Sequence, residues 1–202
     1  MNALDKKKFS ESTDEELILH FQKTNSIEAY NELVKRYKDP LMNFIFKFVG
    51  SRDIAEDILQ ETFFRLYRNK DYYTTVAKFS TWIYTIAANL AKTELRRRNR
   101  RSLFSIHGSN SKDDEEISEY EIPDERYRPD FQTDSNLKYE IIQKALMKVK
   151  PIYRELIILR DIQELSYEEI AEITGLKIGT VKSRINRGRA RLQELLKDIY
   201  FE

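Results

Sequence analysis

The chain has 202 residues, of which 34% are charged and 41% are hydrophobic, and its formal net charge is +1 at pH 7. It contains no cysteine, which excludes a disulfide framework and a thiolate metal site, and it has no apolar run of about 18 residues that would form a membrane span. Residues 1–16 also lack the apolar core and the cleavage site of a signal peptide, so we expect a cytoplasmic protein with no direct membrane insertion.

The charge is distributed unevenly along the chain. Residues 1–101 carry 19 basic and 14 acidic side chains (+5), residues 102–136 carry 3 and 10 (−7), and residues 137–202 carry 13 and 10 (+3). Helix-forming residues dominate, and only 5 Gly and 4 Pro interrupt them. We therefore expect an all-α fold in which an N-terminal tail (1–12) precedes two helical domains (13–101 and 137–202), joined by a flexible acidic linker.

Thr13 and Glu16 have the spacing of a capping box and predict the first helix of the N-terminal domain. Further along, residues 51–69 carry apolar side chains at helical spacing, which predict a buried stripe that includes Phe63, and acidic or amide side chains on the opposite face. That acidic face is either simply solvated or bound by a basic partner protein. Its members are Asp53, Glu56, Asp57, Gln60 and Glu61.

Residues 78–101 predict a helix that combines an amide, cations and aromatic rings on one side. The polar positions recur at i, i+4, i+7 and i+11 from Thr85, and five arginines follow within residues 96–101. This mixture suits single-stranded nucleic acid, because bases stack on aromatic rings for about 1–3 kcal/mol each while cations hold the phosphates. In the alternative interpretation, Trp82 and Tyr84 lie in the core and the arginines stabilise the helix C-terminus. The candidate residues are Thr85, Asn89, Lys92 and Arg96 on the polar face, Trp82 on its flank and Phe79 close by.

Residues 166–196 predict two helices joined by a tight turn. Ser166 and Glu169 form a capping box that opens the first helix, and Gly175 ends it. The second helix begins near Ile178, and its outward face mixes cations, an amide and small polar groups without any acid. The pattern predicts a DNA-binding helix-turn-helix, with a plain helical hairpin as the alternative. The outward face and its flank comprise Thr180, Lys182, Ser183, Arg184, Asn186, Arg187 and Arg191.

Three segments in this order, separated by the acidic linker, resemble one known family. They are DIAEDILQETFFRLY (53–67), FSTWIYTIAANLAKTELRRR (79–98) and LSYEEIAEITGLKIGTVKSRINRGRARL (165–192). Together they resemble a bacterial sigma-70 family RNA polymerase sigma factor of the extracytoplasmic-function (ECF) group. Each segment alone is moderately specific, whereas the three in this order and spacing are very specific. The resemblance covers about residues 10–198, nearly the whole chain.

The resemblance implies that the first domain is sigma region 2, a helical bundle that binds core RNA polymerase and melts and reads the −10 promoter element. Asn89 matches the position that holds a flipped non-template base, with Lys92 beside it and the loop Thr74–Phe79 forming the pocket. The residues that match the polymerase-binding positions are Asp57, Gln60, Glu61 and Phe63.

The second domain resembles sigma region 4, whose helix-turn-helix reads the −35 element in the major groove through positions that match Lys182, Ser183, Asn186 and Arg187. The family often has an aromatic or apolar residue where Asn186 stands, and an asparagine there can pair with adenine. In this family the linker runs through the RNA path of the polymerase, so the ten acids would mimic RNA, unless the linker is only a soluble spacer. An anti-sigma factor is a further expected partner.

The resemblance therefore implies a sigma factor that binds core RNA polymerase and directs promoter-specific transcription initiation. We expect no enzymatic activity, metal or cofactor: the chain has no Gly-rich phosphate loop, and His20 and His107 are far apart in the sequence. One alternative is a stand-alone helix-turn-helix transcription regulator, against which the polar and aromatic face of residues 82–92 argues. Another is an adaptor that binds only proteins and sequesters an anti-sigma factor.

Overall fold

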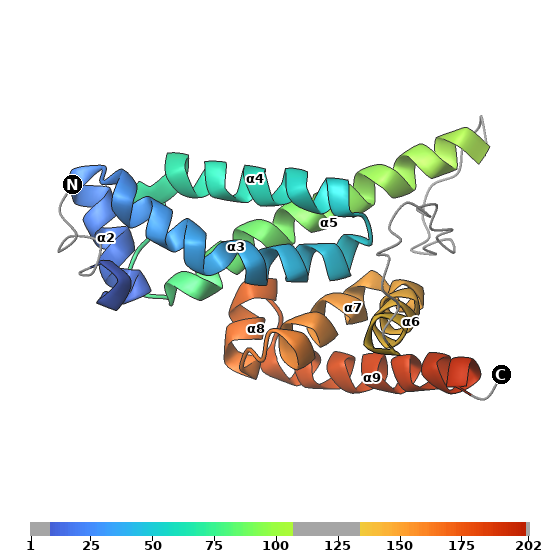
Figure 1. Cartoon of the computed structure of the whole chain (residues 1–202). Coiled ribbons are helices and arrows are strands. Elements are labelled where there is room, and N and C mark those ends of the chain that lie inside the picture. The colour runs from blue at the N-terminus through green and yellow to red at the C-terminus, as the bar shows by residue number, and fades with distance from the viewer. Residues whose placement is uncertain (1–8, 107–133, 201–202) are drawn as a thin grey trace.

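The computed structural model describes residues 9–106 and 134–200, and helices dominate both segments (Figure 1). Residues 107–133, which hold most of the expected acidic linker, lie outside the described residues, as do residues 1–8 of the expected tail. No strand occurs in the described segments, so the expected all-α fold is confirmed for them. In chain order the elements are α2 (Asp14–Thr24), α3 (Ile27–Val49), α4 (Arg52–Asn69), the 3-10 helix η1 (Lys70–Tyr72), α5 (Phe79–Ile106), α6 (Asp134–Lys148), α7 (Pro151–Ile157), the π-helix η2 (Ile158–Ile162), α8 (Tyr167–Thr174) and α9 (Ile178–Tyr200).

Local sequence chemistry sets several of the helix ends. The predicted capping box at Thr13 is confirmed, because its hydroxyl accepts from the Glu16 amide at 3.2 Å and the Glu16 carboxylate accepts from the Thr13 amide at 2.8 Å. The second predicted box, between Ser166 and Glu169, is confirmed at the start of α8. Gly175 ends α8 at φ 70°, a left-handed conformation that costs glycine little.

Helices α2, α3, α4 and α5 form the N-terminal bundle (Figure 1). Its core is aromatic and aliphatic, and the side chains of Phe21, Phe44, Phe48 and Leu33 are at most 1% exposed. The apolar stripe of each helix is buried against its neighbours, which is the main source of stability in a bundle of this kind. Helix α5 is the longest element and continues beyond the bundle at one end.

Helices α6 to α9 form the second bundle, in which α9 packs against α6, α7 and α8. Its small core contains Ala145, Leu146 and Leu195. At the crossing of α7 and α9 the close approach depends on Gly188, since a Cβ atom there would lie 2.7 Å from Ile157 Cδ1 and 3.0 Å from Tyr153 Cβ. The glycine therefore fixes how near these two helices can lie.

The two bundles pack on each other, and one apolar cluster runs from Leu17 in α2 through to Ile185 in α9. The Arg154 guanidinium of α7 donates to the carbonyl oxygen of Phe48 at the end of α3, at 2.8 Å. The Tyr84 hydroxyl of α5 donates to Gln163 Oε1, just after η2, at 2.6 Å. The sequence patterns predicted a tether between two domains but not this contact between them.

We expect Gly188→Ala to lower the free energy of unfolding by up to about 2 kcal/mol. Overpacking costs about 1–3 kcal/mol, and the gain in helix propensity offsets about 1 kcal/mol of it. Urea denaturation of the full chain measures the change. Gly179→Ala is the matched control, because a Cβ atom at Gly179 meets nothing within 4 Å. Equal stability of the two variants would contradict a close approach at Gly188.

Candidate nucleic-acid interface

The outward face of α9 lies where the sequence pattern placed it. Lys182, Ser183, Asn186, Arg187 and Arg191 are exposed, and Thr180 and Arg184 are half-buried. The opposite stripe is buried, with Val181 and Ile185 both 0% exposed. Farther along, Leu195 is the more buried leucine at 8% exposed, while the predicted Leu192 and Leu196 are half-buried, because α6 covers a slightly different side of the helix.

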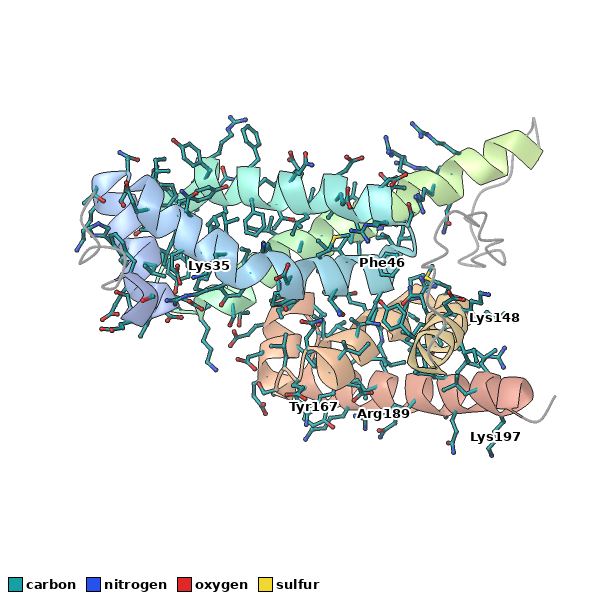
Figure 2. The ribbon with its side chains drawn as sticks, in the orientation of Figure 1. Lys35, Phe46, Lys148, Tyr167, Arg189 and Lys197 are labelled. Carbon is teal, nitrogen blue, oxygen red and sulfur yellow. The ribbon has the colours of Figure 1, made fainter. Side chains whose placement is uncertain are left out.

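Two side chains next to this face were not predicted. Tyr167 lies beneath two cations, with the Arg160 guanidinium carbon 4.8 Å and Lys182 Nζ 5.4 Å from the ring centroid. Arg189 is exposed and its guanidinium donates to the Asp161 carboxylate. Figure 2 shows Tyr167 and Arg189 on the side of the helix-turn-helix that faces away from the N-terminal bundle. The helix-turn-helix therefore presents a basic and aromatic surface to solvent.

On α5, Asn89 and Arg96 are exposed, whereas Thr85 and Trp82 are half-buried. The Thr85 hydroxyl donates to the Thr81 carbonyl oxygen at 2.7 Å, so this hydroxyl is turned back toward its own helix. The Trp82 ring packs against Tyr73, with ring centroids 5.4 Å apart. The polar face is thus open to solvent at Asn89 and Arg96, whereas it is partly covered at Trp82 and Thr85.

Lys92 lies at the contact between the bundles. Its Nζ atom is 3.3 Å from Glu155 Oε1 of α7, and the Lys92 side chain is 26% exposed. Burial raises the pKa of the Glu155 carboxyl, and the neighbouring Lys92 ammonium opposes that rise. Just before the start of α5, the Lys78 ammonium donates to the Glu169 carboxylate at 2.8 Å and lowers the pKa of that carboxyl. Acidic groups of the second bundle therefore neutralise cations beside the α5 face.

Phe79, one of the candidate −10 residues, is buried in this arrangement. Its side chain is 0% exposed, because α2, Tyr37 and Tyr73 cover the first turn of α5. Tyr84 is 4% exposed and belongs to the core, as the alternative interpretation had it. The loop before α5 is open instead, and Val76 is 94% exposed.

The predicted acidic face of α4 is present on the surface. Asp53, Glu56, Asp57 and Gln60 are exposed, and Glu61 is half-buried. Glu61 accepts a hydrogen bond from Arg65 at 2.7 Å.

The remaining residue of the polymerase-binding set, Phe63, is 8% exposed and packs in the bundle core, as its helical spacing predicted. Its neighbours Phe64 and Tyr67 are 53% and 43% exposed and were not predicted. The sequence pattern that could have indicated the exposure of Phe64 is the pair of adjacent phenylalanines, because only one of two adjacent residues in a helix can face the core. Tyr67 lies three positions after Phe64 and therefore on the same side of the helix.

The fold and these faces define an all-helical protein that carries a helix-turn-helix. Two family models match it: Sigma-70 region 2 at residues 33–101 and Sigma-70, region 4 at residues 139–192. A similar protein is the ECF RNA polymerase sigma factor SigW of Bacillus subtilis, 35% identical over 173 residues that cover 85% of this chain and 91% of the relative. The ECF RNA polymerase sigma-E factor of Escherichia coli is 31% identical over 191 residues, which cover 93% of this chain and 96% of the relative.

A similar solved structure is that of the sigma factor RpoE in complex with the anti-sigma factor NepR from Bartonella quintana. Its TM-score is 0.63 at 30% sequence identity, and the match covers 85% of this chain and 98% of that one.

The chain belongs to the sigma-70 family of RNA polymerase sigma factors, in the ECF group. It is a sigma factor, a non-catalytic class of transcription initiation factor, and directs transcription from promoters. A stand-alone regulator is not favoured, because the similarity spans both domains rather than the helix-turn-helix alone. Within residues 9–106 and 134–200, no helix is long and apolar enough to cross a membrane. The same segments hold no cluster of side chains suited to a metal ion.

We expect Phe63→Ala and Phe64→Ala to differ sharply in stability. Loss of the buried Phe63 ring should lower the free energy of unfolding by about 3–5 kcal/mol, because it leaves a cavity in the bundle core. Loss of the exposed Phe64 ring should change it by about 0.5 kcal/mol or less. Chemical denaturation of both full-length variants measures this, and similar losses would show that Phe63 is not a core residue.

Proposed function

We propose that this sigma factor binds core RNA polymerase with α4, reads the −35 element as duplex with α9 and holds the melted −10 element on α5. The observation that carries the proposal is the face of α9, which exposes cations and an amide without an acid among Lys182, Ser183, Asn186 and Arg187. It sits on the second helix of a helix-turn-helix, the element that enters the major groove in such motifs. The domain limits that we propose remain 13–101 and 137–202, with the acidic linker at 102–136.

The chemistry of each candidate residue on the outward face of α9 supports a particular contact with DNA. The Asn186 amide can bond adenine N6 and N7, and the Arg187 guanidinium can bond guanine O6 and N7. Lys182 and Arg191 suit phosphates, which position the helix without reading sequence. The Ser183 hydroxyl donates to the Thr180 carbonyl oxygen at 3.0 Å, so it is oriented to accept from a base amino group. Thr180 and Arg184 complete the flank of the surface.

The −10 step relies on binding energy. Opening DNA breaks stacking of about 1.4 kcal/mol per base-pair step, and flipping a base costs a few kcal/mol. Asn89 is exposed to take a flipped base, Trp82 offers part of a ring for stacking, and Arg96 and Lys92 suit the backbone. Capture of the open strand then shifts the population from closed to open DNA. Phe79 contributes by supporting Trp82 from the core, at a ring distance of 6.1 Å.

The acidic face of α4 fits a basic surface of the polymerase, through Asp57, Gln60 and Glu61. Exposed Phe64 and Tyr67 lie on the same helix and add apolar contact area, and aromatic residues are enriched in protein interfaces. Phe63 packs in the bundle core and so holds α4 in position.

An anti-sigma factor is a further proposed partner, since the related RpoE is known in complex with the anti-sigma factor NepR. We place the protein in the cytoplasm, where the polymerase works, and assign it no enzymatic activity.

Reading both promoter elements requires the two bundles to separate. Elements about 20–25 base pairs apart lie roughly 70–85 Å apart at 3.4 Å per pair. The α5 face instead lies beside the second bundle, with Lys92 paired to Glu155 at 3.3 Å. The packed form is therefore a state of the free protein, and polymerase binding would hold the bundles apart. Tethering both bundles to one polymerase then raises the affinity of each for its element through effective concentration.

The deciding experiment is run-off transcription with purified core polymerase on genomic fragments, with and without the full chain. New start sites that appear only with the protein would support the proposal, and their alignment would identify both elements. Absence of initiation, together with no co-migration of the chain with core polymerase, would refute it.

At the −35 element, we expect Arg187→Ala to weaken the binding of the polymerase complex to its promoter by about 1–3 kcal/mol, or roughly 5- to 150-fold. Discrimination at one base position of the −35 element should relax at the same time. Competition gel shifts on duplexes that vary this element measure both effects. Lys197→Ala is the control: its side chain is exposed near the far end of α9 (Figure 2), so it should leave the base preference unchanged.

For the packed form, we expect Gln163→Ala to raise the affinity of the free protein for a single-stranded −10 oligonucleotide. The variant loses the bond to the Tyr84 hydroxyl, and a bond worth about 0.5–1.5 kcal/mol corresponds to roughly a 2- to 12-fold shift toward the separated state. Fluorescence anisotropy measures the affinity, with exposed Gln193→Ala of α9 as control. Equal affinities would mean that the packed form does not compete with DNA.

A further inference from the structure

Helix α2 contacts both ends of the segment that connects α4 to α5. At one end, the Gln22 amide Nε2 donates to the carbonyl oxygens of Lys70 at 2.7 Å and Tyr73 at 2.9 Å. At the other end, Glu15 Oε1 accepts from the backbone amide of Phe79 at 3.0 Å. All three bonds join α2 to a backbone more than 45 positions away in the chain, so they are tertiary contacts.

Glu15 and Gln22 are seven residues apart on α2, which is close to two helical turns and places them on the same side of the helix. One rigid element therefore holds both ends of the loop at a fixed separation. The hydrogen bond between the Phe79 amide and the Glu15 carboxylate is also electrostatically favourable. The amide of Phe79 belongs to the first turn of α5, where backbone donors have no partner within the helix and a carboxylate complements the dipole.

Between these two ends the loop is partly anchored and partly free. Tyr73 is 3% exposed, its hydroxyl donates to the Ala77 carbonyl oxygen at 2.9 Å, and its ring packs on Trp82. By contrast Thr74, Thr75 and Val76 are exposed. The loop thus offers the consecutive residues 74–76 to solvent, between two ends that hydrogen bonds from α2 hold in place.

We infer that Glu15 and Gln22 are positioning residues that set the geometry of the −10 reading loop relative to α5. The inference rests on the proposed function, together with the expectation from the resemblance that the loop Thr74–Phe79 and Asn89 form one base pocket. Neither residue needs to touch DNA. Each acts on the backbone that carries the pocket, and without them the loop samples several separations from Asn89. The consequence is loss of discrimination between bases at the −10 element, rather than loss of binding to polymerase.

The test uses Gln22→Met, which keeps the length and helix propensity of the side chain and removes its donor. The full-length variant and core polymerase transcribe a pool of promoters randomised at the −10 and −35 positions, and the transcripts are sequenced. We expect the preference at the most selective −10 position to fall by about tenfold, which corresponds to about 1.4 kcal/mol. The −35 preference should stay unchanged.

Conservative variants at Glu15 separate positioning from charge. Glu15→Gln retains an acceptor for the Phe79 amide and should keep the −10 preference, whereas Glu15→Met removes the acceptor and should broaden it. Gln193→Met is the matched control, because Gln193 is an exposed glutamine of α9 without a role in the loop. All comparisons are base ratios within one pool, so a variant that is partly unfolded lowers the yield without changing the ratio.

The possible results distinguish failure of the positioning role of Glu15 and Gln22 from failure of the proposed function. If wild type transcribes selectively and Gln22→Met or Glu15→Met gives less transcript with the same −10 preference, the two residues are only structural and the inference is wrong. The same conclusion follows if both preferences broaden together. If wild type itself directs no transcription, the proposed function fails first, before the loop is tested.

Discussion

The relative placement of the two bundles depends on one buried cation. Arg154 is 4% exposed, and its guanidinium donates to the carbonyl oxygens of Phe48, Met147 and Val149 at 2.7–3.2 Å. Loss of such bonds would leave a buried charge without compensation, which costs about 3–5 kcal/mol when a buried pair is broken. The same guanidinium therefore shapes the turn between α6 and α7 and docks that turn on the end of α3.

Around Arg154, favourable and unfavourable contributions to the contact between the bundles nearly offset each other. Burial disfavours the charged form of Glu155, as the raised pKa of its carboxyl reflects, and Lys92 compensates only in part. Lys47 is 6% exposed beneath the Tyr139 ring, and its burial lowers the pKa of its ammonium group. Apolar burial favours the contact, and these desolvated charges oppose it. A contact of this kind can hold the free protein together and still give way when a larger surface binds.

Local chemistry explains which parts of the molecule could be predicted from sequence. The capping boxes and the outward face of α9 depend on residues within one or two turns, so spacing alone places them. The burial of Phe63 follows from the helical spacing of the apolar residues in α4, whereas the burial of Phe79 depends on which helices cover α5, and α5 contacts α2, α3, α4 and α8. Helical periodicity does not identify the buried side of a helical turn that neighbouring elements cover on several sides, as at the first turn of α5. The contacts of Tyr84 with Gln163 and of Arg154 with Phe48 join residues 79 and 106 positions apart, and no local pattern signals them.

The π-helix η2 has a consequence for how this family can tolerate insertions and deletions. A π turn holds one residue more than an α turn, and η2 lies between α7 and the helix-turn-helix. A one-residue insertion or deletion in an uninterrupted α-helix rotates all that follows by about 100°, whereas a π turn takes up one residue locally. The π turn of η2 lies directly before Gln163, the partner of Tyr84, and it contains Asp161, the partner of Arg189. Removing one residue here would therefore leave the rotation of the helix-turn-helix relative to the N-terminal bundle nearly unchanged, whereas a deletion within α9 would not.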